Sequence, residues 1–237
     1  MNQQEATKIL EFVSNFQNKA QTIERFVGNP YVKGDNIAEH LARMARLFLY
    51  IIPDLKKEFP NEKDLIENTV SCLLVHDDDE VIDGFDIPTA LKKHNVKDDE
   101  EILKFRQAVT DLPKDTGEHL ILAFSTFRKK DSLPAKIAKA LDNLVGNQFV
   151  IEQKIGLVNP DQTRFAIEYA EKVKGTSKVI DTLVDAQIDQ IIECRKQLRK
   201  NPSEIGLQKE KADAFLEIDV MTHKLNKDKI NLPLEKL

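Results

Sequence analysis

The chain has 237 residues, of which 41% are hydrophobic and 32% are charged, and its formal net charge is −5 at pH 7. This composition is typical of a soluble globular protein, and it excludes a fibrous repeat or a disordered chain. A net acidic chain does not favour a nucleic-acid backbone or an anionic membrane as its main partner, because both require a basic face. We therefore expect no nucleic-acid or membrane partner.

The cysteine content and the N-terminal sequence bear on where the protein works. Cys72 and Cys194 lie far apart and form no CxxC pair, so neither a disulfide framework nor a thiolate zinc site is supported. The first residues show no basic region followed by an apolar core, and no stretch reaches the ~18 uninterrupted apolar residues of a membrane span. We expect a cytoplasmic protein that is neither exported nor membrane-spanning.

The first two helices are predicted from apolar periodicity and capping residues. Apolar residues repeat at three- and four-residue intervals from Ile9 to Phe26, which predicts one long helix. Asp35 and Asn36 offer an N-cap for a second helix, with Glu39 three residues after Asn36 as a capping-box partner. We expect this second helix to end at Pro53, since proline interrupts helical hydrogen bonding.

A third helix is expected from about Glu62 to Asp77. It ends in an apolar run over residues 71–75, which predicts that its last turns are buried. A loop over residues 83–89 is indicated by an Asp-Gly pair close to a proline. The same periodicity predicts further helices at about residues 99–109, 117–130, 132–145, 161–174, 178–200 and 202–224. No alternating strand is evident, so the predicted fold class is all-α.

Four side chains on three predicted helices are of the types that bind a catalytic metal: His40, His76, Asp77 and Asp142. Neutral imidazoles and ionised carboxylates on rigid elements bind a divalent ion and leave positions open for water and substrate. A single helical histidine is more often structural, but a cation would offset the cost of burying the His76–Asp77 pair beside an apolar run. The sequence therefore predicts one divalent metal, and manganese, cobalt, iron, zinc and magnesium all stay open.

Several segments follow one another in an order and spacing that match a known family over about residues 5–175. They are Arg25–Phe26, Asn36–His40, Leu73–Val81, Gly84–Thr89 and Lys139–Asp142. Together they resemble the HD-domain metal-dependent phosphohydrolases, and within these the bacterial 5'-deoxynucleotidases. The resemblance implies an HD-domain helical bundle, with a phosphohydrolase core over residues 1–175. Residues 176–237 lie outside the resemblance, and we expect them to form a helical extension. Its apolar face of Ile180, Leu183, Ile188, Ile191 and Ile192 is expected to pack on the core, form a dimer or cover the active site.

The resemblance also implies roles for individual residues. It implies that His40, His76, Asp77 and Asp142 bind the metal and that Glu80 activates or orients the attacking water. A carboxylate one helical turn from a ligand is also well placed to accept a proton from that water.

Three further positions would contact the substrate by this resemblance. Arg25 matches a residue near the phosphate, which suits a guanidinium, although a surface salt bridge is the alternative. Asp86 matches a carboxylate that contacts the sugar, with Phe85 as a one-residue insertion before it. Phe26 stands where monophosphate-specific members have Trp, and its alternative role is the last core position of the first helix.

The leading hypothesis is hydrolysis of a (deoxy)ribonucleoside 5'-monophosphate to nucleoside and phosphate, with a small-molecule nucleotide as partner. One alternative is hydrolysis of a nucleoside triphosphate or an alarmone, although alarmone hydrolases have Glu-Asp where this chain has Glu80 and Val81. The other alternative is a nucleotide-binding protein without turnover. Family members are often dimers, so the resemblance also implies a possible homodimer.

Overall fold

The computed structural model describes residues 1–27, 32, 34–86, 98–154, 157 and 160–200. Most of these residues are helical, and the β contact found among them is an isolated bridge between Glu24 and Asn36. The all-α fold class is confirmed. The chain divides into two compact units, Met1–Val27 with Gly34–Asp142 and Gly28–Lys33 with Asn143–Leu237. The expected boundary of a phosphohydrolase core at residue 175 stays a prediction.

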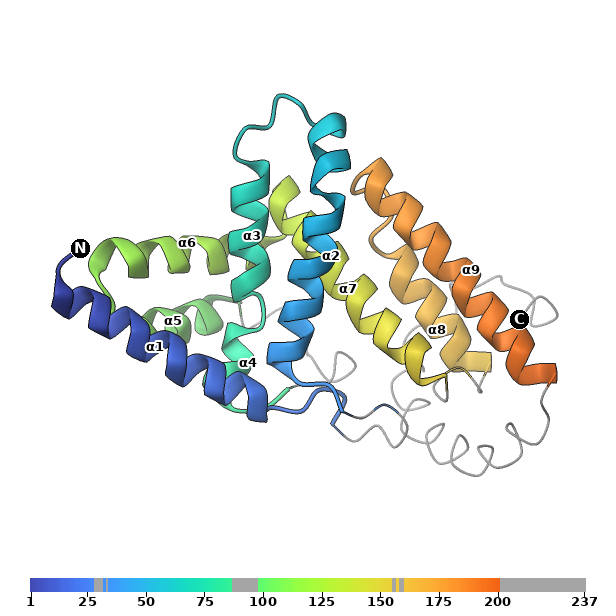
Figure 1. Ribbon diagram of the computed structural model, residues 1–237, viewed down its shortest axis with the longest axis horizontal. Helices are drawn as coiled ribbons and strands as arrows, with labels where there is room; N and C mark the ends of the chain where they lie inside the picture. The colour runs from blue at the N-terminus through green and yellow to red at the C-terminus, as the bar shows by residue number, and fades with distance from the viewer. Residues whose placement is uncertain (28–31, 33, 87–97, 155–156, 158–159, 201–237) are drawn as a thin grey trace. The chain divides into compact units, whose positions relative to one another are not determined.

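Figure 1 shows the helices in chain order. The first unit contains α1 (Gln3–Thr22), α2 (Ile37–Glu58), α3 (Leu65–Val75), α4 (Asp78–Asp83), α5 (Asp98–Ala108) and α6 (Lys114–Lys129). Helix α7 (Leu133–Gln153) begins in the first unit and continues into the second, which also contains α8 (Pro160–Glu171) and α9 (Lys178–Lys200). The helices expected in residues 99–200 are confirmed, although α7 is longer than predicted. The helix expected at residues 202–224 lies outside the described residues.

Helix α1 ends earlier than its apolar repeat predicts. It stops at Thr22, and Ile23 is extended, with φ −91° and ψ 105°. The reason is a pairing with the segment before α2: Arg25 N–H donates to the Asp35 carbonyl at 3.0 Å, and Ile37 N–H donates to the Ile23 carbonyl at 3.3 Å. The prediction of a helix through Phe26 is therefore wrong, because backbone hydrogen bonds to a distant segment replace those of the helix.

Helix α2 begins where the sequence predicts and ends later. The Asn36 side chain caps it by accepting the Glu39 N–H at 2.9 Å. The helix continues through Pro53 to Glu58, so the expected end at Pro53 is wrong. A proline removes one hydrogen bond to the carbonyl four residues earlier, and here that residue is Leu49, which is 62% exposed. A missing hydrogen bond costs less on an exposed face of a helix than in the core, because water can replace the lost partner there.

The predicted third helix ends at Val75, two residues earlier than expected, and a short helix that was not predicted follows after a break at His76 and Asp77. Helix α3 ends at Val75 and α4 begins at Asp78, while Asp77 has a non-helical φ of −106° and ψ of 15°. The Asp77 carbonyl accepts the N–H groups of Glu80 at 3.0 Å and Val81 at 3.2 Å, which starts the new helix. The break places two polar side chains directly after the buried end of α3.

Two apolar clusters hold α4 in the first unit. One consists of Val75, Phe105, Val109, Leu112, Ala123 and Phe124, and the other of Ala20, Ile23, Ile37 and Val81. The rings of Phe105 and Phe124 stack with centroids 4.4 Å apart. Partly buried Ile82 packs on the first cluster and Val81 lies in the second, so α4 is anchored to both. Burial at this level is the main source of stability for a short helix.

The second unit has its own apolar cluster, in which α8 and α9 lie side by side (Figure 1). Ile191 of α9 is buried with Ile151, Leu157, Ala166 and Ile167, and further isoleucines of α9 pack against them. The apolar face predicted in residues 180–192 is thus used for packing within this unit.

Candidate metal centre

Three of the four predicted metal ligands converge in the structure. His40 lies in the first turn of α2, His76 at the break between α3 and α4, and Asp142 in α7. His40 Nε2 is 3.1 Å from Asp142 Oδ1, and His76 Nε2 is 3.8 Å from the same oxygen. One potential ligand atom from each residue lies within 4.8 Å of the others, and all three residues are buried. These separations suit atoms that share one ion.

The orientation of His76 suits a ligand. Its Nδ1 lies 2.8 Å from the Leu73 carbonyl, and a carbonyl can accept only if that nitrogen carries the proton. In the neutral ring the lone pair is then on Nε2, the nitrogen that faces Asp142. Nε2 is also 3.1 Å from Asp77 Oδ2, but it is buried and lacks the alignment of a hydrogen bond. Metal-binding histidines are commonly held through the other ring nitrogen in this way.

Asp77 lies at the edge of this group and is shared with Arg25. Arg25 Nη1 donates to Asp77 Oδ2 at 2.7 Å, and Arg25 Nη2 is 3.9 Å from Asp142 Oδ1. The Arg25 side chain is 13% exposed. The structure therefore brings the predicted phosphate contact and the predicted metal ligands into one cluster, while the role of Asp77 as a ligand stays a prediction.

The electrostatics of the cluster favour a cation. Burial, with the charge of Arg25, lowers the pKa of His40 to about 4, so this imidazole is neutral at physiological pH, as a ligand must be. Burial also opposes a charged His76, but Asp77 and Asp142 outweigh it and raise the pKa of His76 to about 10. Burial likewise opposes charge on Asp142, yet Lys139 and the two histidines hold the pKa of Asp142 well below its usual range.

These observations test whether the residues fit a divalent ion. A proton on His76 supplies positive charge between Asp77 and Asp142, and a divalent ion bound there would supply it in place of that proton. The donor set combines imidazole nitrogen with carboxylate oxygen, which suits several first-row divalent metals. The residues present therefore fit the predicted metal.

Glu80 also lies at this cluster. It is 3% exposed and is in the first turn of α4, four residues after His76. The pKa of Arg25 reflects its surroundings: burial lowers it, but Asp77, Asp142, Asp86 and Glu80 together raise it above its ordinary value. Each of these four carboxylates is thus close enough to act on the Arg25 guanidinium.

A long-range hydrogen bond joins Phe26 and Asp86 beside Arg25. Asp86 Oδ2 accepts the backbone N–H of Phe26 at 3.0 Å, and the Arg25 guanidinium lies over the Phe26 ring at 5.8 Å from its centroid. Phe26 has a φ of 59°, a left-handed conformation that is costly for a residue with a Cβ. Phe26 is half-buried and lies outside α1, so its alternative role as the last core position of that helix is wrong.

The cluster has further members that sequence reasoning missed. Asp35 is buried and pairs with Arg43, whose Nη1 is 2.7 Å from Asp35 Oδ1. Lys139 Nζ donates to Asp142 Oδ2 at 2.5 Å, and its three-residue spacing from Asp142 was the available signal. Asp35 gave no such signal, because its neighbour Asn36 already explained the start of α2.

A second polar cluster lies outside the metal centre. Arg128 of α6 pairs with Asp79 of α4 and, at 2.9 Å, with Glu101 of α5. The Arg128 guanidinium also lies over the Phe124 ring, 5.0 Å from its centroid. Arg128 lies in the last turn of α6, which ends at Lys129. The longer-range role of Arg128 depends on a contact that no spacing reveals.

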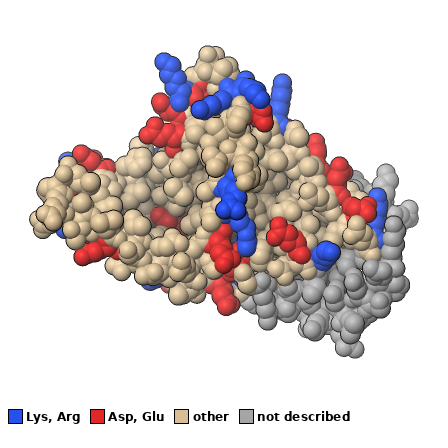
Figure 2. Space-filling view, in the orientation of Figure 1, with Lys and Arg blue, Asp and Glu red and all other residues tan. Residues whose placement is uncertain are grey.

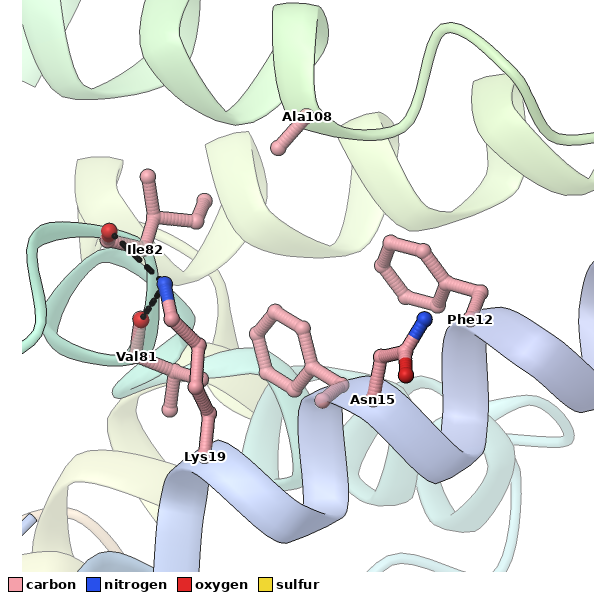
Figure 3. Close-up of a pocket in the computed structure, with 7 residues that line it drawn as sticks. Phe12, Asn15, Lys19, Val81, Ile82 and Ala108 are labelled. Atoms are coloured by element: carbon pink, nitrogen blue, oxygen red, sulfur yellow. Dashed lines mark hydrogen bonds between the residues drawn. The ribbon is translucent and has the colours of Figure 1, made fainter. Parts of the chain in front are cut away.

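A cavity of about 240 Å³ lies between α1, α4 and α5, and it contains none of the predicted site residues. Figure 3 shows Phe12, Asn15 and Lys19 on α1, with Lys19 directed at Val81 and Ile82 of α4 and Ala108 of α5 on the far side of the cavity. Lys19 Nζ donates to the Val81 carbonyl at 3.1 Å and to the Ile82 carbonyl at 3.3 Å. A cation suits these carbonyls at the C-terminal end of α4, so this region helps to fix the helix that carries Glu80.

None of the helices in the described part of the chain is long and apolar enough to cross a bilayer.

Comparison with known proteins identifies the fold family. The model of the HD domain matches residues 17–186. The chain is similar to the crystal structure of a predicted metal-dependent phosphohydrolase from Magnetospirillum magnetotacticum MS-1, with a TM-score of 0.61 and 21% identity over 80% of this chain and 94% of that one. This likeness shows a shared fold, and no curated protein sequence matches the chain. Because the HD-domain match spans most of the chain and includes every predicted site residue, the protein belongs to the HD-domain family.

Proposed function

We propose that the protein is a metal-dependent phosphohydrolase that acts on a nucleotide phosphomonoester, with a (deoxy)ribonucleoside 5'-monophosphate as substrate and nucleoside and phosphate as products. The observation that carries the proposal is the meeting of His40, His76 and Asp142 within 4.8 Å, beside a buried arginine. Membership of the HD-domain family supports the hydrolytic reaction. The similar protein from Magnetospirillum magnetotacticum is itself a predicted metal-dependent phosphohydrolase, which is consistent with this proposal.

In this proposal His40, His76, Asp77 and Asp142 hold one divalent cation. When bound, such an ion neutralises charge on the phosphate and lowers the pKa of a water ligand. The neutral state of His40 and the ionised state of Asp142 are already those that a ligand requires. Lys139 holds one oxygen of Asp142, which leaves the other directed at the two imidazoles.

Arg25 and Glu80 act on the substrate and the attacking water. The two Nη groups of Arg25 point to the metal-site carboxylates, so a phosphate bound at the metal would lie within their reach. A guanidinium can donate two parallel hydrogen bonds to phosphate oxygens, which fixes the group for attack. Glu80, buried one helical turn after His76, would accept the proton of the attacking water.

Phe26 and Asp86 are proposed to contact the nucleoside. Asp86 accepts from the Phe26 backbone and Phe26 lies against Arg25, which supports a role for both residues next to the proposed phosphate contact. The Phe26 ring provides an apolar surface for the sugar or base. If Asp86 contacts the sugar, Asp86→Asn will change the ratio of kcat/KM between ribonucleotides and deoxyribonucleotides. An equal loss on both would show that Asp86 acts through the Phe26 backbone instead.

The surface supports a small-molecule partner. Figure 2 shows Lys and Arg side chains interspersed with Asp and Glu over the coloured part of the face in view. A nucleic-acid partner would favour a continuous basic field instead. A cytoplasmic location and a homodimer stay predictions.

The experiment that tests the proposal is phosphate release from a panel of nucleoside mono- and triphosphates with manganese, cobalt or magnesium. Asp142→Asn is the matched variant, because it keeps the size of the side chain and removes the charge. Metal-dependent release from monophosphates that is lost in Asp142→Asn is expected. Release from triphosphates alone, or nucleotide binding without any release, would contradict the proposed substrate or the proposed turnover.

A further inference from the structure

Asp35 is the least exposed charged side chain at the edge of the metal centre, and it is not a proposed metal ligand. Its side chain is 0% exposed. It lies just before α2, where Asn36 and not Asp35 caps the helix. A carboxylate removed from water in this way is costly unless specific partners compensate it. Its position therefore calls for an explanation other than helix capping.

The contacts of Asp35 lead to Arg25. Arg43 Nη1 donates to Asp35 Oδ1 at 2.7 Å, which fixes one oxygen of the carboxylate. The other oxygen, Oδ2, faces Arg25 Nε at 3.5 Å, and neither of these two atoms has an aligned hydrogen bond. The Asp35 carbonyl also accepts the Arg25 N–H at 3.0 Å. Asp35 therefore contacts Arg25 through its backbone and, electrostatically, through its side chain.

The two edges of the Arg25 guanidinium therefore have different neighbours. The Nε edge faces Asp35, while Nη1 and Nη2 face Asp77 and Asp142. An arginine side chain has several rotatable bonds, and a negative charge at Nε restricts them without occupying the Nη donors. The two Nη groups are then presented together toward the place where a phosphate would bind.

We propose that Asp35, held by Arg43, is a positioning residue that orients Arg25 for the phosphate of the substrate. This inference rests on the proposed function, because it assumes that Arg25 binds phosphate. The alternative is that Asp35 and Arg43 form a structural ion pair with no effect on the site. The two explanations differ in whether the effect of changing Asp35 depends on Arg25.

The test is a double-mutant cycle on the full chain with manganese, using Asp35→Asn, Arg25→Gln and the double variant. Asn keeps the shape of Asp and can still accept from Arg43, but it has no charge to attract Arg25. Glu39→Gln is the matched control, because Glu39 also contacts Arg43, at 3.4 Å, and its side chain is 55% exposed. The readouts are KM and kcat for a deoxyribonucleoside monophosphate, the inhibition constant of inorganic phosphate, bound manganese and the thermal unfolding midpoint.

Asp35→Asn is expected to raise KM and the phosphate inhibition constant by about tenfold, with kcat changed by less than about threefold and bound manganese unchanged. In the Arg25→Gln background the same change should have less than about a twofold effect, because there is no guanidinium left to orient. Glu39→Gln should leave both constants unchanged. If Asp35→Asn yields no folded protein, Arg43→Gln is the second variant. It removes the cation that holds the Asp35 carboxylate, and the Arg43 side chain is 37% exposed, so the change is easier to tolerate. It carries the same prediction, with a smaller effect.

Equal effects of Asp35→Asn with and without Arg25 would overturn the proposal, as would a lowered unfolding midpoint with KM unchanged. Failure of the proposed function has a different signature. In that case the wild type releases no phosphate from the panel, and phosphate does not bind. If wild type is active and Arg25→Gln has normal KM, the assumed role of Arg25 is wrong, and the positioning role of Asp35 is wrong with it.

Discussion

Replacing Arg128 by Met should destabilise the helix that carries Glu80. Arg128, Asp79 and Glu101 join three helices, and their side chains are 10%, 13% and 19% exposed. Met keeps much of the length of the side chain and still packs on Phe124, so the change mainly removes the charge. Two acids are then left close together without their cation.

The size of the effect follows from this burial. Removing one partner of a fully buried ion pair costs about 3–5 kcal/mol. Because the two acids keep some contact with water, we expect a loss of about 2–3 kcal/mol for Arg128→Met. With a urea dependence of about 2 kcal/mol per molar, the unfolding midpoint should fall by roughly 1–1.5 M.

Lys104→Met is the matched control for this measurement. Lys104 also links α5 to α4, through Asp83 at 2.9 Å, but its side chain is 52% exposed. A screened surface pair contributes little, so its urea midpoint should not change measurably. Circular dichroism during urea unfolding measures both variants. Equal shifts for the two variants, or no shift for Arg128→Met, would refute the reasoning from burial.

Two further predictions concern titration and reactivity. In metal-free protein the pKa of His76 is raised to about 10, above that of an unfolded histidine, so its contribution to stability is fully present below about pH 6.5 and is lost as the pH rises toward 10. His76→Gln should therefore flatten the alkaline loss of stability in urea unfolding after chelation, and an unchanged pH dependence would contradict this. Cys72 is 1% exposed and burial raises the pKa of its thiol to about 11, so it should not react with a thiol reagent at pH 8 until the protein unfolds. In the Cys194→Ser variant, Cys72 is the remaining thiol, and it should react with the reagent only in denaturant. Rapid labelling of the native variant would show that the core around Cys72 opens readily.

Local sequence signals predicted the parts of the fold that depend on neighbouring residues. The Asn36 cap gave the start of α2, and apolar periodicity gave α5 through α9. The sequence placed the end of α3 two residues too late and did not predict α4, because the apolar run up to Val75 continues a helical pattern into His76. Asp77 departs from helical geometry there, and a new helix begins on its carbonyl.

The candidate site also combines residues that the sequence predicted with contacts that it did not. His40, His76 and Asp142 were found because imidazoles and carboxylates near apolar runs are unusual and because their pattern resembles a family. The pairing of Arg25 with Asp35 was missed, since it depends on backbone hydrogen bonds between a segment after α1 and one before α2. Such contacts leave no periodicity in the sequence. The same is true of Arg128, which reaches Asp79 across 49 positions of the chain.

The central claim is that His40, His76, Asp77 and Asp142 hold one divalent ion on which hydrolysis depends. The most direct measurement is a titration of the chelator-treated protein with manganese, in which bound metal and phosphate release from a deoxyribonucleoside monophosphate are followed together, for wild type and His76→Ala. We predict that about one ion binds per wild-type chain, that release rises in parallel with binding, and that His76→Ala loses both. Full release without bound metal, or tight binding that is unchanged in His76→Ala, would contradict the account.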